Sequence, residues 1–222
     1  MIEFSNVSKI YPHGQSSALE NVSLKIAEGE MVFLTGHSGA GKSTVLRIIS
    51  GMEKVTAGTV YFGGNNITRL SKSQLPYYRR LIGMIFQDHK LMMNKTVAEN
   101  VALPLLIKNL TMEEAMMSVE HALQKVGLLS KINTYPLYLS AGEQQRVGIA
   151  RAIVAKPKVL LADEPTGNLD YALSQEIMSL FLELNSDGMT VVMATHDLDL
   201  VASSHKRSIE LQYGKVISDL VI

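Results

Sequence analysis

The residues with the clearest chemistry form a glycine-rich segment near the N-terminus. Gly36-His37-Ser38-Gly39-Ala40-Gly41-Lys42-Ser43 matches the pattern of a phosphate-binding loop, and Thr44 follows it. Its glycines let backbone N–H groups point at phosphate oxygens, Lys42 supplies a positive charge, and the Ser43 hydroxyl can bind Mg²⁺. An apolar run precedes the segment and a helical pattern follows it, which is the context that such a loop requires. We therefore expect the chain to bind a nucleoside triphosphate.

A second candidate site is a pair of acids at the end of another apolar run. Val159-Leu160-Leu161-Ala162 leads directly into Asp163 and Glu164. A strand that delivers an aspartate at its carboxyl end supplies the second anchor for Mg²⁺ beside a phosphate loop. A glutamate one residue later can orient or deprotonate the water that attacks the terminal phosphate. The alternative is a strand that merely ends in two surface acids, and the preceding phosphate loop makes us favour the catalytic interpretation.

Short apolar runs are expected to form the sheet that positions both sites. Residues 31–34, 159–162 and 191–194 are apolar without interruption, which is typical of parallel strands covered by helices on both faces. Helical patterns separate these runs, one of them over residues 42–50. The sequence therefore predicts an α/β fold with a mostly parallel core sheet.

Other parts of the chain carry different patterns. Apolar and polar residues alternate in residues 1–30, which predicts antiparallel strands. Residues 90–156 carry little strand signal and are predicted to be a helical insertion. Two capping-box pairs are expected to begin helices in that insertion: Thr111 with Glu114, and Ser140 with Glu143. Residues 209–218 are predicted to form a hairpin.

Composition excludes several classes of protein. Lysine and arginine together number 21, as do aspartate and glutamate, so the chain lacks the overall positive charge typical of nucleic-acid binding. The absence of cysteine excludes disulfides, iron–sulfur clusters and thiol catalysis. The longest apolar stretch, residues 101–107, is much shorter than the roughly 20 residues of a membrane span. The first residues do not resemble a secretion signal, so we expect a cytoplasmic protein without a membrane span of its own.

A further segment identifies the class of ATPase. Leu139-Ser140-Ala141-Gly142-Glu143-Gln144-Gln145-Arg146 resembles the signature motif of ABC-type ATPases. Other family motifs can then be placed in order along the whole chain. They are the Q-loop glutamine Gln87, the D-loop Gly167-Asn168-Leu169-Asp170, the switch histidine His196, and Tyr11, which sits where the family has an aromatic that stacks on adenine.

This resemblance implies a single ABC ATPase domain over residues 1–222. Its core would comprise about 1–89 and 157–222, joined to an N-terminal antiparallel β subdomain and a helical subdomain at about 90–156. The implied cofactors are ATP and Mg²⁺. The implied catalytic residues are Glu164, His196 and Gln87, and those at the metal are Ser43, Gln87 and Asp163. The implied nucleotide-binding residues are Tyr11, Gly36, His37, Ser38, Gly39, Ala40, Gly41, Lys42, Ser43, Thr44, Ser140, Gly142, Glu143 and Asp170.

The chain contains one phosphate loop and one signature. In the family that it resembles, ATP lies between the loop of one subunit and the signature of another, which implies a head-to-tail homodimer in the ATP-bound state. Two residues depart from the usual signature: Ala141 replaces a glycine, and Glu143 replaces a glutamine. A methyl group at residue 141 requires a negative φ or free space beside the partner's phosphate.

Within this family the motifs are most similar to those of bacterial cell-division ATPases. That resemblance implies a membrane permease partner of the FtsX type, and peripheral association with the cytoplasmic face of the inner membrane. It also implies control of septal peptidoglycan hydrolysis. The same residues resemble the ATPases of lipoprotein-release and macrolide-export systems, which remain the alternative. A protein of another class, an ATP-binding scaffold with little turnover, is the third interpretation.

Two other classes share the phosphate loop. A regulatory GTPase needs an N-K-x-D guanine reader, and Asn94-Lys95-Thr96-Val97 lacks the aspartate. A chromosome-associated ATPase would need long coiled-coil arms, for which 222 residues leave no room.

Five methionines between residues 92 and 117 have two interpretations. They fill the core of the helical subdomain, or they line a groove beside the Gln87 loop for a helix of the membrane partner. These five are Met92, Met93, Met112, Met116 and Met117.

Overall fold

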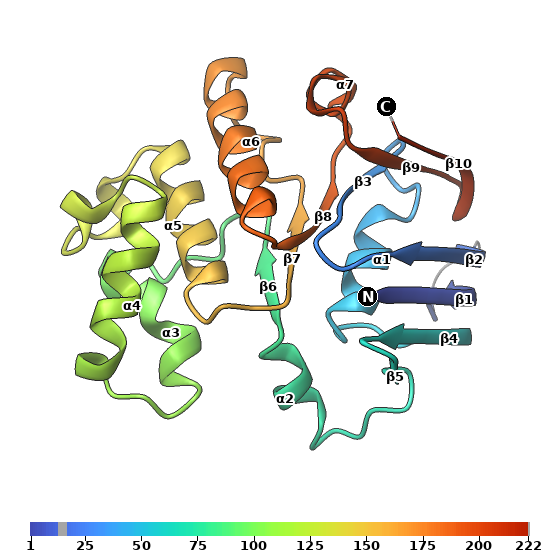
Figure 1. The fold of residues 1–222 in the computed structure, drawn as a ribbon, viewed down its shortest axis with the longest axis horizontal. Helices are drawn as coiled ribbons and strands as arrows, with labels where there is room; N and C mark the ends of the chain where they lie inside the picture. Colours follow the sequence, from blue (N-terminus) through green and yellow to red (C-terminus); the bar gives the residue numbers. More distant parts are fainter. Residues whose placement is uncertain (13–16, 222) are drawn as a thin grey trace.

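A six-stranded sheet carries the strands that end in the candidate residues (Figure 1). The structure, a computed structural model, describes residues 1–12 and 17–221. The strand order is β10-β9-β3-β8-β7-β6, and every neighbouring pair is parallel except β10 with β9. The strands are β3 (Met31–Thr35), β6 (Ile82–Ile85), β7 (Val159–Asp163), β8 (Thr190–Ala194), β9 (Arg207–Gln212) and β10 (Lys215–Val221). The mostly parallel core sheet and the terminal hairpin are thus confirmed.

A second, four-stranded antiparallel sheet contains the first two strands. Its order is β2-β1-β4-β5, from β1 (Ile2–Ile10), β2 (Ser17–Ile26), β4 (Ala57–Phe62) and β5 (Asn65–Asn66). Along β1, Ile2, Phe4 and Val7 are buried while Glu3 and Ser5 face solvent. This alternation confirms the antiparallel prediction for residues 1–30. Strands β4 and β5 were not predicted, because residues 57–66 contain three glycines and little alternation.

Seven helices and two short 3₁₀ turns lie between the strands of the described residues. They are α1 (Lys42–Ile49), α2 (Leu75–Arg79), α3 (Val97–Leu106), α4 (Met112–Lys125), α5 (Ala141–Ile153), α6 (Tyr171–Ser186) and α7 (Leu198–Ser204), with short 3₁₀ turns η1 (Leu129–Lys131) and η2 (Pro136–Tyr138). Helices α3, α4 and α5 pack together at one end of the molecule (Figure 1), and the segment 90–156, all of it described, contains no strand. Both predicted capping boxes are present, and a third, Thr96 with Glu99, begins α3.

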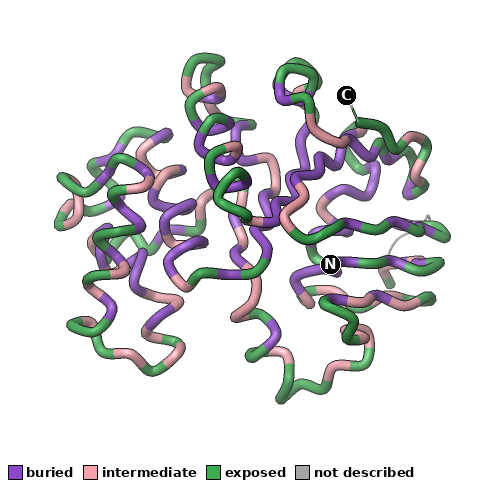
Figure 2. The backbone as a smooth tube through the Cα atoms, in the orientation of Figure 1, coloured by how far each residue is buried: buried purple, intermediate pink, exposed green. Residues whose placement is uncertain are grey.

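Each central strand contributes to two hydrophobic cores. In β3, Met31 and Phe33 point into the core formed with α3 to α6, while Val32 and Leu34 point into the core formed with α1 and the antiparallel sheet. In β7 and β8, alternate side chains likewise point into the two cores. Figure 2 shows the resulting continuous burial of the central strands. The apolar runs are unbroken because both faces of this sheet are covered.

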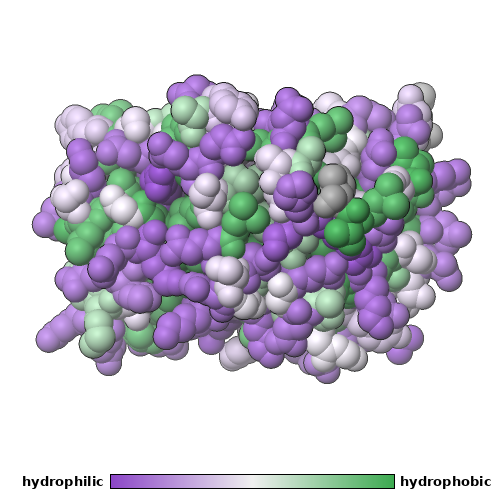
Figure 3. All heavy atoms as spheres, turned by 45° about the horizontal axis from the view of Figure 1, so that its top comes forward, coloured by the Kyte–Doolittle hydropathy of each residue, from purple (hydrophilic) through white to green (hydrophobic). Residues whose placement is uncertain are grey.

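The surface is polar over most of the side that carries the carboxyl ends of the strands. Figure 3 brings this side forward, and apolar atoms gather where β10 and the end of the chain lie. The exposed apolar residues of β10 are Ile217, Leu220 and Val221. Among the described residues, no helix combines the length and apolarity needed to cross a bilayer.

A buried asparagine organises the segment between β6 and α3. Asn100 is fully buried in α3, and its amide donates to the carbonyl oxygens of Met92, Lys95 and Thr96 at 3.0–3.2 Å. Its carbonyl oxygen accepts from the Met92 N–H at 2.8 Å. The side chain is thus within hydrogen-bond distance of four backbone groups, most of them in a segment without regular secondary structure, which fixes this segment after the Gln87 loop.

Replacement of Asn100 by alanine should lower the free energy of unfolding by about 2 kcal/mol, because the partners of a buried amide are left without hydrogen bonds. Chemical denaturation measures this change. Asn65→Ala is the matched control, since the exposed Asn65 amide makes a single 3.3 Å bond to the Gly63 carbonyl oxygen. Equal stability of the two variants would contradict this account of Asn100.

Candidate functional site

The glycine-rich segment forms a loop between β3 and α1. Strand β3 ends at Thr35 and α1 begins at Lys42, so residues 36–41 turn at the carboxyl edge of the sheet. Gly41 has a φ of 113°, and a Cβ atom there would lie 2.8 Å from the Ala18 carbonyl oxygen of β2. Both the left-handed conformation and the close approach require glycine. The loop is thus held against β2, and its backbone curls at the N-terminal end of α1.

Lys42 lies across the mouth of this loop. Its Nζ donates to the carbonyl oxygens of Gly36 at 2.7 Å and His37 at 3.1 Å. The residue is only 5% exposed, and its Nζ is 3.9 Å from Glu164 Oε1. The two carbonyl acceptors and the nearby carboxylate offset the cost of burying this ammonium inside the loop. The Lys42 ammonium is therefore positioned at the loop before phosphate oxygens bind there.

Ser43 and Asp163 form the oxygen-rich part of the site. The Ser43 hydroxyl donates to Asp163 Oδ1 at 2.9 Å, which joins the start of α1 to the end of β7. Burial raises the pKa of Asp163, the Ser43 hydrogen bond opposes this rise, and the nearby Glu164 adds to it. A partly buried carboxylate beside a hydroxyl is the hard-oxygen donor set that Mg²⁺ prefers. These two residues therefore fit a magnesium ion.

Glu164 is held in a conformation that is unusual for glutamate. Its φ is 48°, and its N–H donates to the Ala194 carbonyl oxygen of β8 at 2.9 Å. Its Oε2 is 3.3 Å from His196 Nδ1, so the carboxylate lies between the switch histidine and Lys42. Left-handed backbone is costly for residues other than glycine and concentrates at functional sites. The carboxylate is aimed at the space beyond the phosphate loop.

Gln87 approaches the same place from β6. A methyl group on Gly167 would lie 3.6 Å from Gln87 Nε2 and 3.5 Å from Glu164 Oε2, so both side chains converge on the D-loop glycine. The structure thus brings together the lysine, serine, aspartate, glutamate, histidine and glutamine that the sequence singled out.

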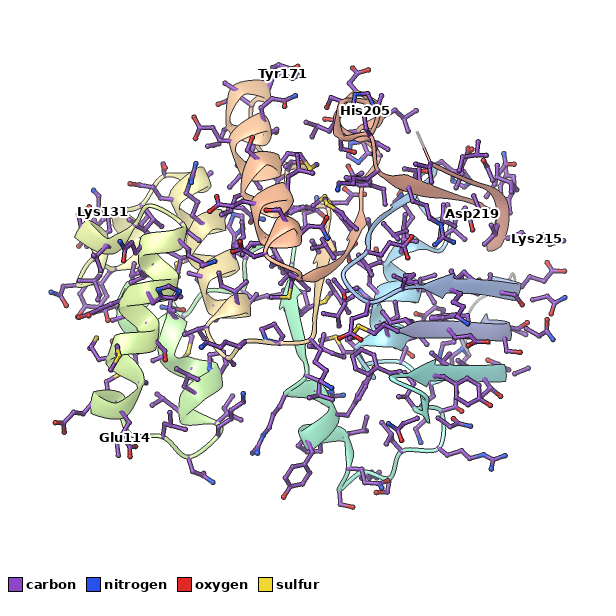
Figure 4. The ribbon with its side chains drawn as sticks, in the orientation of Figure 1. Glu114, Lys131, Tyr171, His205, Lys215 and Asp219 are labelled. Atoms are coloured by element: carbon purple, nitrogen blue, oxygen red, sulfur yellow. The ribbon has the colours of Figure 1, made fainter. Side chains whose placement is uncertain are left out.

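Two cavities meet at Glu164. The first, about 270 Å³, is lined by Ala18, the loop residues 38–44 and Glu164. The second has the same volume and is lined by residues of the D-loop and the switch region, among them Gly167, Tyr171 and His196. Tyr171 stands at the upper end of α6 and is 70% exposed (Figure 4). Glu164 therefore separates a space shaped for phosphate from a space beside the D-loop.

The signature residues lie elsewhere. Ser140 caps α5: its hydroxyl accepts from the Glu143 N–H, and its own N–H donates to Glu143 Oε2 at 2.9 Å. Ala141 is the first residue of α5 and has a negative φ, so its methyl group meets the condition stated for this position. None of residues 140–143, all described, lines the cavity at the phosphate loop. Glu143 serves the helix cap and lies 3.9 Å from Lys131 Nζ.

The signature is linked to the D-loop within the chain. Asp170 caps α6 by accepting from the Leu173 N–H at 2.9 Å. A Cβ atom on Gly142 would lie 2.4 Å from Leu173 Cδ2, so the missing side chain makes room for Leu173. The sequence did not single out Leu173, whose only signal is an apolar residue one turn after a helix cap.

Three other predicted residues have these surroundings. The His37 ring is 5.0 Å from the Tyr213 ring, and Thr44 is buried in α1. Tyr11 follows the end of β1, and the ammonium of Lys9 lies 4.7 Å from the centre of its ring.

Sequence reasoning missed an arginine behind the Gln87 loop. Arg151 of α5 donates to the carbonyl oxygens of His89 at 2.5 Å and Lys90 at 2.8 Å. Both of these residues have positive φ values. A hydrogen bond from a side chain to two strained carbonyls leaves no pattern in the sequence.

Comparisons with known proteins show the family to which the chain belongs. Residues 19–167 match the model of the family described as ABC transporter. The chain is 55% identical over 214 residues, 96% of each chain, to the "Cell division ATP-binding protein FtsE" of Escherichia coli K12. It is 44% identical over 219 residues to the protein of that name from Mycobacterium tuberculosis, with 99% of this chain and 95% of that one covered.

A solved structure shows the same fold. It is the dimeric structure of a post-hydrolysis state of the ATP-binding cassette MJ0796 bound to ADP and Pi, with a TM-score of 0.91 and 40% identity. The match covers 100% of this chain and 98% of that one. Together with the family match, this likeness leads to one conclusion: the chain belongs to the ABC transporter family of ATP-binding proteins.

Proposed function

We propose that the chain is the ATP-hydrolysing subunit of a membrane ABC complex in bacterial cell division. The position of Glu164 carries the catalytic part of this proposal, because its carboxylate lies between Lys42 and His196 at the border of two cavities. The relatives named as cell-division ATP-binding proteins support the biological part, since they are 42–55% identical over nearly the full chain.

The chemistry follows from the charges around the loop. Backbone N–H groups of residues 38–43 and the Lys42 ammonium bind the phosphates of ATP. Ser43 and Asp163, with Gln87 nearby, would hold Mg²⁺, which neutralises charge on the outer phosphates. Glu164 orients the attacking water and accepts its proton. His196 holds the Glu164 carboxylate in place and faces the departing phosphate.

We infer that the site is completed by a second copy of this chain. The signature residues do not line the loop cavity of their own chain, although their capped helix end presents backbone N–H groups and a positive dipole. A head-to-tail pair would bring Ser140 and Gly142 of one copy to the ATP of the other, and Asp170 to the boundary between them. The dimeric MJ0796 cassette supports this arrangement.

The membrane partner is proposed to be a permease of the FtsX type. This would place the chain at the cytoplasmic face of the inner membrane, where ATP-driven dimerisation controls septal peptidoglycan hydrolysis. A groove of about 490 Å³ between α2, β6, α3 and α5 supports a docking site beside the Gln87 loop. Its walls are apolar and carry only positive charges, which fits an amphipathic helix with acidic residues. The charged residues are Arg79, Arg80, Lys90, Lys108 and Arg151.

The methionines do not form this groove. Met92, Met93 and Met117 are exposed, whereas Met112 and Met116 are half-buried, so the cluster is not simply core. Met117 lines a different cavity, between the carboxyl ends of α4 and α6. The groove beside the Gln87 loop is instead lined by apolar residues such as Phe86, Leu103 and Ile107.

Glu164→Gln should leave ATP binding intact and lower the hydrolysis rate by at least about a hundredfold, because the amide cannot accept the proton of water. With ATP and Mg²⁺, this variant should accumulate as a dimer in analytical ultracentrifugation. Glu120→Gln, an exposed residue on α4, is the control and should hydrolyse at the parental rate. Parental turnover by Glu164→Gln would refute the role of Glu164.

Mixing two inactive variants tests the shared site. Lys42→Ala removes the loop charge, and Ser140→Arg blocks the signature, so each variant alone should be inactive. In a head-to-tail dimer of one Lys42→Ala chain and one Ser140→Arg chain, one of the two ATP sites has both an intact phosphate loop and an intact signature. Random mixing should therefore recover up to about a quarter of the parental turnover. A mixture as inactive as its components would contradict assembly of the site across two chains.

The groove is tested with an exposed apolar residue on its rim. Ile107 is 59% exposed, and Ile107→Glu should weaken copurification with the membrane permease by about tenfold, because a buried carboxylate opposes apolar docking. Met117→Glu is the matched control, because that residue is 81% exposed on another face. Equal permease binding by both variants would exclude this groove as the docking site.

A further inference from the structure

Lys9 is a buried charged residue that the mechanism above does not use. The residue is 8% exposed at the inward-facing end of β1. Its Nζ donates to Glu53 Oε2 at 2.8 Å and to the Lys54 carbonyl oxygen at 2.8 Å. A buried ammonium is costly unless its protons have partners. Two of its three protons are thus accounted for within the described residues.

The third proton has an aromatic partner. The Nζ atom lies 4.7 Å from the centre of the Tyr11 ring, which is a cation–π distance. Tyr11 comes directly after β1 ends at Ile10, so the strand ladder does not fix its ring. Lys9 covers one face of the ring. Only the opposite face remains for a base to stack on.

The same ammonium is anchored to the helix that begins at the phosphate loop. The N–H groups of Met52 and Glu53 both donate to the Arg47 carbonyl oxygen, near the end of α1, at 2.8 and 3.1 Å. Helix α1 starts at Lys42 and extends about 12 Å at 1.5 Å per residue. The contact of Lys9 with Tyr11 and the phosphate loop are therefore linked to opposite ends of one short helix.

We propose that Lys9 is a positioning residue that sets the Tyr11 ring as one wall of the base site. Anchored by Glu53 and Lys54, its ammonium holds the ring at a fixed distance from the phosphate loop. The Tyr11 ring and the phosphate loop are then correctly spaced before the nucleotide binds. Binding therefore loses no conformational entropy from ordering the ring. This inference rests on the proposed function, because it requires the base of ATP to stack on Tyr11.

The test compares ATP with inorganic tripolyphosphate, which has the phosphates but no base. Calorimetric titration of the full chain should show that Lys9→Met weakens ATP binding about fivefold, or about 1 kcal/mol, with tripolyphosphate binding unchanged. The KM for ATP should rise while kcat stays the same. Lys9→Arg keeps the cation and should restore affinity. In the double variant with Tyr11→Ala, Lys9→Met should weaken ATP binding almost no further than Tyr11→Ala does alone, because both changes disrupt the same contact.

The comparison of two ligands within one variant separates positioning from a loss of stability. Lys25→Met, an exposed lysine on β2 that lies 3.8 Å from Glu3, is the control and should change neither affinity. If Lys9→Met folds poorly, Glu53→Gln loosens the same anchor and should shift the ATP affinity alone, in the same direction. Equal weakening of ATP and tripolyphosphate, or no effect on ATP, would overturn the inference.

Each failure identifies its own cause. If Tyr11→Ala weakens ATP binding and Lys9→Met does not, the inference about Lys9 is wrong and the proposed site stands. If Tyr11→Ala does not change the affinity for ATP, the base does not stack on Tyr11. Both the inference about Lys9 and the base site at Tyr11 are then wrong. If the parental chain neither binds nor hydrolyses ATP, the proposed function itself fails.

Discussion

The site depends on four neighbouring parallel strands that end at one edge of the sheet. The order β3-β8-β7-β6 places the phosphate loop, the switch histidine, the acidic pair and the glutamine on consecutive strands, each about 4.8 Å from the next. Ala194 pairs with both Leu34 and Asp163, so it aligns the loop with the acids. No contact between the catalytic side chains creates this alignment. It comes from the backbone register and from the two apolar cores that cover the faces of the sheet.

The unusual backbone conformation of Glu164 sets the direction of its carboxylate more closely than the sheet does. Strand register alone would leave the Glu164 carboxylate free to point along the sheet edge. The left-handed turn at that residue, anchored by the Ala194 carbonyl oxygen, directs it between Lys42 and His196. Such a conformation persists only where the surrounding structure determines it. Here the buried end of β8 and its pairing with Asp163 of β7 provide that support.

The sequence predicted most of the framework because its signals are local. Uninterrupted apolar runs reveal strands covered on both faces, and a hydroxyl residue three positions before a glutamate reveals a helix start, as at Thr111 and Ser140. The proposed catalytic residues were singled out because each lies in a short motif, and Gln87 and His196 were assigned through the family resemblance. Strand order, by contrast, was not predicted, because the pairing of strands far apart in the sequence leaves no local pattern. Contacts such as Gly142 with Leu173, or Lys9 with Tyr11, depend on side chains that meet only after folding, and short patterns do not encode them.

Helix α5 links two places where different subunits act. The helix is capped by Ser140, which would contact the ATP bound by the other chain. Near its other end, Arg151 donates hydrogen bonds to the carbonyl oxygens of His89 and Lys90, which follow Gln87 in the chain. A helix of 13 residues is a stiff rod about 20 Å long. A tilt at the Ser140 end of this helix would therefore also displace the backbone that Arg151 binds. Because Arg151 also lines the groove proposed for the permease, closure of two chains around one ATP would displace this groove before ATP is cleaved.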